Sequence, residues 1–434
     1  MTMEVDKSGQ GFEIQGEELA SAAGARAPPP ASATKTQSLE FESILSPAAV
    51  GESLWTGRKW RRALASVWVV IFHAKINVLL PFGPLAILLH YLTDKHKGWV
   101  SLFSIIGITP LSERLGYANE QLAFSTGPTV GGLLNVIFGN ATEIIISIYA
   151  LKNGMIRVVQ LSLLGSILSN MLLVLGCAFF AGGIVHYNKD QVFNKASAVI
   201  SSGLLLMALL GLMFPTVLHF THTELHYGKS ELALSRFSSC IMLVAYANYL
   251  FFQLKTRRNI YSPINEEEEE EALAKDEKEI TQGEAICWIF VLTFWISVLS
   301  GYLVDAIQGP HESLGLPEAF VSVILLPTAE HARTIMFAMK DKLDITLEIA
   351  IGSSTRISMF VIPFCVVIGW MMGQQMDLNF GLFETATLFI TVIIVAFMLQ
   401  QGVSNYFKGL VLIFCYFLVA ARSFAHVDPD TSDN

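Results

Sequence analysis

The sequence predicts an all-α polytopic membrane protein with about eleven transmembrane helices, in which two sets of five helices form inverted repeats after an extra N-terminal helix. Three observations predict this fold. The chain of 434 residues is 53% hydrophobic and only 15% charged, with a mean hydropathy of +0.51, which is too apolar for a soluble protein. Its apolar runs reach the length of about 20 residues that crosses a bilayer as a helix. One long polar break divides these runs into six and five.

The polar N-terminal segment, residues 1–57, is predicted to be a disordered cytoplasmic tail. It has no apolar stretch and carries the run Ala25–Pro30 among many serines and threonines, so it cannot bury enough surface to fold alone. The basic and aromatic cluster at 58–62 that follows is typical of the cytoplasmic face of a membrane. We therefore expect a cytoplasmic N-terminus and an interfacial helix over residues 61–75, before the first span.

Eleven apolar runs follow, and each predicts one transmembrane helix. Their ranges are 76–92, 99–121, 127–151, 155–183, 196–218, 231–254, 284–307, 317–339, 344–371, 382–400 and 404–425. The polar break at 255–283 contains the glutamate run Glu266–Glu271 and is predicted to be an acidic cytoplasmic linker, with cation trapping as the alternative. Once the first span is set aside, five spans lie on each side of this linker. An odd number of spans per half forces the halves into opposite orientations, which makes them inverted repeats.

The predicted domain organisation follows from these boundaries. The domains are a tail (1–57), an interfacial segment with the first transmembrane helix (58–92), a first repeat (93–254), the acidic linker (255–283), a second repeat (284–426) and a short C-terminal tail (427–434).

Each half carries a glutamate inside a predicted membrane helix, Glu143 or Glu330, that is followed 22 residues later by a Gly-Ser pair, which contains Ser166 or Ser353. A carboxylate in a helix of hydrocarbon length is expensive and marks a functional site. Asn140 lies three residues before Glu143, hence on the same helix face. Ca²⁺ binds about six to eight oxygen atoms from carboxylates, amides, hydroxyls and carbonyls, so these residues predict a site for a hard divalent cation. For the serines, packing between helices is the alternative.

A histidine, His331, directly follows Glu330. Its charge changes near neutral pH, which suits it to relay protons or to ligate a metal; a packed histidine with satisfied hydrogen bonds is the alternative. Three further histidines, His219, His222 and His226, crowd one loop on the predicted non-cytoplasmic side. There we expect them to face solvent, and weak binding of a transition metal is the alternative.

The run Gly139–Glu143, the run Leu161–Asn170 and the pair Glu330-His331 resemble the cation/proton exchangers of the Ca²⁺/cation antiporter superfamily, and more narrowly their plant vacuolar members. The resemblance covers about residues 58–426. It implies an eleven-span fold with an acidic loop after the sixth span, and proton-driven uptake of Ca²⁺ into the vacuole, with Mn²⁺ as another possible cargo. It also implies that Glu113 in the second span takes part in proton handling.

The second motif departs from the pattern of that family, Gly-Asn-Ala-Ala-Glu-His. It is shorter by about four residues, and Pro327 stands as far before Glu330 as Asn140 stands before Glu143. Proline offers neither a side-chain oxygen nor an N–H group, so one amide ligand is lost. We therefore expect Pro327 to weaken the second half of the site.

Three charged residues also depart from the family pattern, since Arg333 and Glu348 stand where it has small residues and Arg356 where it has Gln. An arginine stays charged in a protein and must find a carboxylate, water or the membrane interface. One interpretation is that Arg356 or Arg333 pairs with Glu330 or Glu348 and acts as a tethered substitute cation that interferes with divalent binding. The alternative is that Arg333 pairs with Glu348 near a helix end, or that either arginine extends to the interface.

The predicted function is a vacuolar membrane cation/proton antiporter, not an enzyme, in which Glu143 and Glu330 face each other and bind either Ca²⁺ or protons. It needs no resident cofactor, because Ca²⁺ and H⁺ are its cargo. A rival interpretation is a transport-impaired or regulatory paralogue or splice product, which the shortened motif and Arg356 favour. A passive cation channel is a third, and the chain has no tetrameric filter signature to favour it.

The predicted partners are divalent cations, protons, the lipid bilayer and a homo- or hetero-oligomer. The net charge of −9 argues against nucleic acid as a partner. The sequence has no Gly-x-x-x-x-Gly-Lys-Ser/Thr loop, so it does not support pumping driven by ATP.

Overall fold

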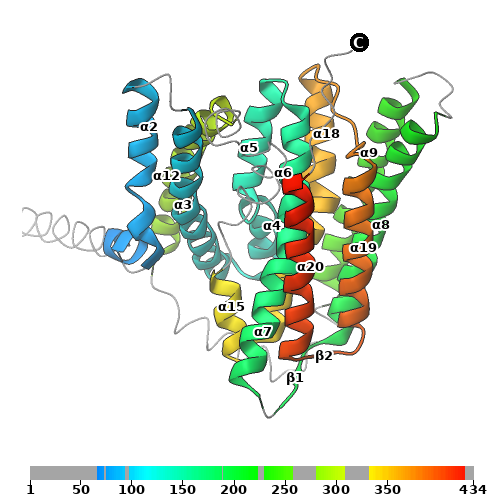
Figure 1. The fold of residues 1–434 in the computed structure, drawn as a ribbon. Coiled ribbons are helices and arrows are strands. Elements are labelled where there is room, and N and C mark those ends of the chain that lie inside the picture. The colour runs from blue at the N-terminus through cyan, green and yellow to red at the C-terminus, as the bar shows by residue number, and fades with distance from the viewer. Residues whose placement is uncertain are drawn as a thin grey trace, which may run out of the picture. The chain divides into compact units, whose positions relative to one another are not determined.

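The computed structural model describes residues 66–72, 75–92, 97–187, 189–222, 229–257, 280–307 and 332–425 (Figure 1). They lie in one compact unit, residues 62–434. This part of the chain is almost entirely helical, and its two strands, β1 (Gln191–Val192) and β2 (Val403–Ser404), pair antiparallel with Gln191 opposite Ser404. The predicted tails, 1–57 and 427–434, and most of the predicted linker lie outside the described residues.

The described helices of the first half follow one another from the first span to the start of the linker. They are η1 (Trp68–Phe72), η2 (Lys75–Leu79), α2 (Phe82–Leu92), α3 (Lys97–Thr126), α4 (Pro128–Phe138), α5 (Ala141–Lys152), α6 (Ile156–Leu168), η3 (Ser169–Val174), α7 (Leu175–Val185), α8 (Lys195–Thr221), α9 (Lys229–Phe251) and η4 (Phe252–Arg257). Of these, η1, η3 and η4 are π-helical and η2 is a 3₁₀-helix. Asn77 joins the first two by donating from Nδ2 to the carbonyls of Val70 and Ile71 at 3.0 and 2.7 Å.

The second half repeats this helical character. Its described elements are α12 (Gln282–Asp305), α15 (Ala332–Met339), α16 (Leu343–Leu347), η7 (Glu348–Gly352), α17 (Ser353–Arg356), η8 (Ile357–Val361), α18 (Ile362–Met371), α19 (Leu382–Leu399) and α20 (Tyr406–Ala425). The segments η7 and η8 are π-helical, and they interrupt one continuous helical run from 343 to 371.

The described helices agree with the predicted spans. Seven runs are long and apolar enough to cross a membrane, and a bent pair of helices, 130–138 with 141–152, makes an eighth. The helix α3 occupies the predicted second span, 99–121, but it is more polar because it carries charged residues in its interior. The first predicted span matches the shorter apolar segment Ile76–Leu92. Of the predicted span 317–339, only the part from residue 332 is described.

The contacts between helices follow the two halves in a matched pattern. The helices that open each half, α3 and α12, pack on each other, and so do the fourth spans, α8 and α19. The third span of each half packs on the fifth span of the other: α7 contacts α20, and α18 contacts α9 (Figure 1). This exchange of partners is what two inverted repeats of five helices predict.

The core lies along the third span of each half. We compare the buried share of an apolar stretch of 18 residues in each span. This share is 83% in Ile156–Val185 and 61% in Leu343–Met371, whereas in Lys229–Leu254 it is only 17%. The outer helix α9 exposes large apolar side chains such as Phe237 and Val244, as expected for a surface that faces lipid. Against the core, α20 approaches α7 so closely that a Cβ on Gly183 would lie 2.2 Å from the backbone nitrogen of Tyr406.

Candidate cation-binding site

The helix that carries the first predicted motif is broken at the motif itself. The helix α4 ends at Phe138, α5 begins at Ala141, and their axes differ by 41°. Between them Gly139 is packed tightly, because a Cβ there would lie 2.4 Å from the carbonyl oxygen of Asn135. Asn140 leaves the helical region, with φ −133° and ψ 25°, and is fully buried. Broken helices of this kind bring polar groups into the interior of membrane proteins.

A chain of polar side chains connects the break to the other half of the molecule. The Ser353 hydroxyl donates to Oδ1 of Asn140 at 3.3 Å and accepts from Nδ2 of Asn170 at 3.5 Å. These residues come from the α4–α5 break, from α17 and from η3, so the two repeats meet here. The structure thus places the predicted ligands Asn140 and Ser353 in contact, although 213 positions separate them.

Both central spans change from α to π geometry beside this contact. In the first half η3 begins three residues after Ser166, which is 5% exposed, and in the second half η7 and η8 flank the short α17 that begins with Ser353. The segment α17 contacts both α6 and η3. A π-helical turn inserts an extra residue and recurs at functional sites, because it re-aims side chains and loosens the backbone ladder.

Glu143 lies in the first turn of α5, directly after the break, where the helix dipole favours a negative charge. Its Oε2 atom is buried and has no hydrogen-bond partner among the residues that the structure describes. The guanidinium group of Arg356 lies close enough to act on this carboxylate electrostatically. A buried carboxylate oxygen without a partner needs a cation or a proton.

Arg356 and Glu348 lie together at one side of the site. Arg356 Nη1 is 3.8 Å from Glu348 Oε1, and the two side chains are 11% and 49% exposed. They line a cavity with Asn135, Tyr246 and Thr355, among other residues, at the end of α9 that leads to the predicted cytoplasmic linker. Glu348 is therefore half-exposed, while Arg356 is largely buried and acts electrostatically on both Glu348 and Glu143.

Glu113 is held by its own neighbour on α3. Arg114 donates from Nε to Oε2 of Glu113 at 2.6 Å and from Nη2 to Oε1 at 2.5 Å, and both side chains are largely buried. The preceding residue, Ser112, shares a 2.7 Å hydrogen bond with Thr142, next to Glu143. The two charge-assisted hydrogen bonds of this arginine–carboxylate pair fix the orientation of the Glu113 side chain.

The rest of the second motif lies largely outside the described residues. Pro327, Glu330 and His331 belong to that part, and of Arg333 only the backbone, in the first turn of α15, is described. Within the described part of the chain, no three His, Cys, Asp or Glu residues gather closely enough to hold a metal ion.

The family follows from comparison with known proteins. The model of the family "Sodium/calcium exchanger protein" matches residues 96–255 and 284–425, leaving out the predicted linker. The chain is 75% identical over 423 residues to vacuolar cation/proton exchanger 2 of Oryza sativa subsp. japonica, a match that covers 96% of this chain and 97% of that protein. The chain belongs to the vacuolar cation/proton exchangers of this family. The resemblance seen in the motifs is thereby confirmed.

Further relatives support the same assignment for the exchanger. Vacuolar cation/proton exchanger 2 of Arabidopsis thaliana is 69% identical over 373 residues, covering 84% of each chain. Among solved structures, native YfkE superposes with a TM-score of 0.69 at 31% identity, covering 81% of this chain and all of that one. The H⁺/Ca²⁺ exchanger CAX has a TM-score of 0.60 at 11% identity, covers 81% of this chain and 91% of that one, and supports the fold.

Other polar residues of the exchanger make local contacts or pair with a neighbouring helix. The hydroxyls of Ser354, Thr355 and Ser358 donate to carbonyls of their own helical run. His219 is not simply a solvent-facing loop residue, because its Nδ1 lies 2.8 Å from Oε2 of Glu231. The chain gives no local signal for that pair, because the two residues belong to different helices, α8 and α9.

Proposed function

We propose that the exchanger moves Ca²⁺ into the vacuole in exchange for protons, as a multi-pass protein of the vacuolar membrane. The observation that carries this proposal is the buried contact between the two repeats, where Asn140 meets Ser353 beside the unpartnered carboxylate oxygen of Glu143. The high identity to vacuolar cation/proton exchangers supports both the reaction and the compartment. The name of YfkE in one solved structure, a Ca²⁺/H⁺ antiporter at 31% identity, supports Ca²⁺ as the cargo.

The proposed ligands are oxygen atoms that the break brings together. Glu143 supplies a carboxylate, Asn140 its amide oxygen, and Ser353 and Ser166 hydroxyls, all of which suit a hard divalent cation. In the present arrangement the Ser353 hydroxyl donates to Oδ1 of Asn140. A cation at Asn140 replaces that donor, so the hydroxyl turns to offer its lone pairs. Glu330, in the second motif, is the proposed partner carboxylate.

Exchange of the divalent cation for protons follows because these carboxylates bind either the cation or protons, but not both at once. When the site faces the acidic lumen, protons bind Glu143 and Glu330 and displace the divalent ion, because a ligating carboxylate must be deprotonated. When it faces the cytoplasm the carboxylates ionise and bind the next ion. His331 and Glu113 are the proposed proton-handling residues beside this pair. The same oxygen ligands accept Mn²⁺, so other divalent ions are candidate cargo.

A second candidate function rests on Arg356, whose guanidinium lies within electrostatic range of Glu143. A fixed positive charge beside a cation site opposes divalent binding. Together with Pro327 in place of an amide ligand, and Arg333 close behind it, this charge favours a transport-impaired chain. Such a chain acts by joining an oligomer, with its own kind or with an active paralogue, and regulating it.

Proton-driven ⁴⁵Ca²⁺ uptake into sealed vesicles tests the proposal. The Glu143→Gln variant keeps the shape of the side chain but removes its charge, so uptake is expected to vanish. The Asp305→Asn variant, at an exposed carboxylate that only accepts a hydrogen bond from Asn153, serves as the control and keeps the parental rate. Uptake at the parental rate in Glu143→Gln removes this residue from the site. A parent that transports no divalent ion favours the second candidate.

A further inference from the structure

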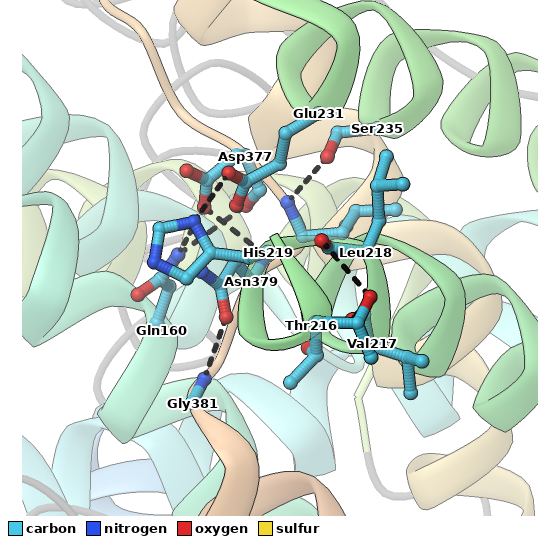
Figure 2. Close-up of polar contacts among 12 residues, drawn as sticks. Gln160, Thr216, Val217, Leu218, His219, Glu231, Ser235, Asp377, Asn379 and Gly381 are labelled. Atoms are coloured by element: carbon cyan, nitrogen blue, oxygen red, sulfur yellow. Dashed lines mark hydrogen bonds and ion pairs between the residues drawn. The ribbon is translucent and has the colours of Figure 1, made fainter. Parts of the chain in front are cut away.

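A second polar cluster closes the opposite end of the core from the predicted cytoplasmic linker. Here the ends of α6, α8 and α9 meet the segment 372–381, which connects α18 to α19 (Figure 2). Gln160 of α6 donates from Nε2 to Oδ1 of Asp377 at 2.9 Å, and the backbone nitrogen of Leu378 donates to the Ser235 hydroxyl of α9 at 3.0 Å. The segment is thus tied to helices of the first repeat.

Two carboxylates come together inside this cluster. Glu231, in the first turn of α9, is 4% exposed, and Figure 2 shows its carboxylate beside that of Asp377. Its Oε2 atom lies 2.8 Å from Nδ1 of His219, at the end of α8. Its Oε1 atom is buried and has no hydrogen-bond partner among the residues described in the structure. An unpartnered acceptor next to a second carboxylate is an arrangement that one proton satisfies.

The surroundings of Asp377 favour that proton. Burial, and after it the negative charge of Glu231, raise the pKa of Asp377 to about 6, although hydrogen bonds from Asn379 and Gln160 and the charge of His219 act in the opposite direction. A carboxyl group with this pKa is protonated in an acidic compartment and ionised at neutral pH.

Other charged groups at this end of the molecule have partners of their own. Arg157 of α6 donates to the carbonyl of Phe380 at 2.6 Å and pairs with Glu384 of α19 at 3.1 Å. Arg422 of α20 pairs with the same Glu384 at 2.9 Å. Arg236 of α9 lies over the ring of Trp370, 4.8 Å from its centroid.

We propose that Glu231, Asp377 and His219 form a proton-binding site at the non-cytoplasmic mouth, separate from the site at Asn140 and Glu143. The proton comes from water, bonds to an Asp377 carboxylate oxygen and is donated in a hydrogen bond to Oε1 of Glu231. In the described part of the chain no three metal-binding side chains gather closely enough to hold a metal ion, and the ligand that we propose is a proton.

Protonation at this site affects how the mouth is held together. When both carboxylates are ionised they repel each other across the junction between α9 and the segment 372–381, and one shared proton removes that repulsion. The segment continues into α18, in the span of Ser353, and Gln160 lies on α6, in the span of Ser166. Protonation of this site by an acidic lumen can therefore affect both central spans. This effect on transport rests on the proposed function, whereas proton binding itself does not.

Infrared difference spectroscopy of the purified full-length protein tests proton binding without transport. A background with both Glu143→Gln and Glu330→Gln removes the contribution of the two proposed transport carboxylates, and it separates this test from the proposed function. Between pH 5 and 7 we expect a protonated-carboxyl C=O band with a midpoint near 6. The band disappears in Asp377→Asn and persists in Asp305→Asn, at an exposed carboxylate expected at the same membrane face. A band unchanged in Asp377→Asn overturns the proposal.

Two further variants keep the test decisive if Asp377→Asn fails to fold. Glu231→Gln removes the like charge, so the midpoint moves down from about 6 toward the ordinary value of 3.8. His219→Gln removes a charge that favours ionised Asp377, so the midpoint moves up. Midpoints that move in opposite directions in these two variants support the site, because residues with only a packing role would not shift the midpoint according to their charge. Shifts in the same direction, or none, contradict it.

Discussion

The central spans of the two repeats, 156–185 and 343–371, hold corresponding positions but are built differently. The first is the more buried, because 83% of an apolar stretch of 18 residues is buried there, against 61% in the second. The one charged residue of the first span, Arg157, lies at its end. The second carries Glu348 and Arg356 well inside its length, and both line a cavity. Both spans nevertheless contain π-helical segments beside the contact between the repeats.

This difference separates what the site requires from what modifies it. The π geometry and the buried hydroxyls are common to both repeats, so we assign them to the binding of the cation, whereas the amides Gln160 and Asn170 belong to the first central span alone. The charges Glu348 and Arg356 line a cavity of the second span, as expected for ionised groups at membrane depth. We therefore assign ligand geometry to the shared features and adjustment of affinity to the Glu348–Arg356 pair.

The largest effect is expected from Ser353, the residue that joins the two spans. Ser353→Ala removes the group that donates to Asn140 and accepts from Asn170, so both amides lose their orientation. Loss of a residue that ligates or orients ligands lowers ion affinity about 10- to 100-fold. The control is Ser354→Ala, whose hydroxyl bonds only to its own helix at Ala350. Equal Ca²⁺ uptake rates in the two variants contradict the role of Ser353.

Tight packing of the first central span predicts the next effect. In Gly183→Ala the new methyl group meets the backbone of α20 at Tyr406, and overpacking of this kind costs about 1 to 3 kcal/mol. Gly203→Ala on α8 meets nothing within 4 Å and is the matched control. Thermal denaturation in detergent measures both. A melting temperature of Gly183→Ala at or above that of Gly203→Ala contradicts the tight packing of the first central span against α20.

A smaller effect is expected from the charges of the second span. Arg356→Gln removes a positive charge near Glu143, and after screening this is worth about 1 kcal/mol, or about fivefold tighter Ca²⁺ binding. Glu348→Gln leaves Arg356 without its partner and weakens binding. The double variant should behave like Arg356→Gln alone, which a double-mutant cycle of Ca²⁺ affinities measures. Additive effects argue that the two charges act independently.

The smallest effect is expected on the pH dependence of stability, through Asp377 in the segment 372–381. The pKa of Asp377 is raised from 3.8 to about 6, so the folded protein holds a proton there that the unfolded chain releases. The stabilisation is complete below pH 3.8 and is lost as the pH rises through about 6. Because Asp377 is half-buried, screening leaves about 1 kcal/mol. Asp377→Asn should flatten the pH dependence of the melting temperature over this window, and an unaltered slope contradicts the assignment.

Much of the fold follows from length and hydropathy alone. Apolar runs of membrane-spanning length predicted the described spans to within a few residues, because a bilayer imposes helices on any such run. The break at Asn140 also has a local cause, since Gly139 precedes it and fits where a Cβ does not. Family membership followed from the same motif.

The pairing of side chains was less predictable. Both Glu330 and Glu348 were candidate partners of Arg356, and the spacing of eight residues to Glu348, about 12 Å along a regular α-helix, did not decide between them. The π-helical segment η7 lies between Glu348 and Arg356, and no sequence pattern predicts such a segment. The cluster at Glu231 and Asp377 was not predicted either, because tertiary packing brings its members together from distant parts of the chain.

The central claim is that one carboxylate, Glu143, binds either a divalent cation or a proton. It is tested most directly by measuring the protons released when Ca²⁺ is added to the purified, weakly buffered protein, with no membrane potential or gradient. The account predicts proton release that rises as the pH falls toward the acidic range, that is kept in Asp305→Asn and that is absent in Glu143→Gln. Ca²⁺ binding with the same proton release in Glu143→Gln as in the parent contradicts it.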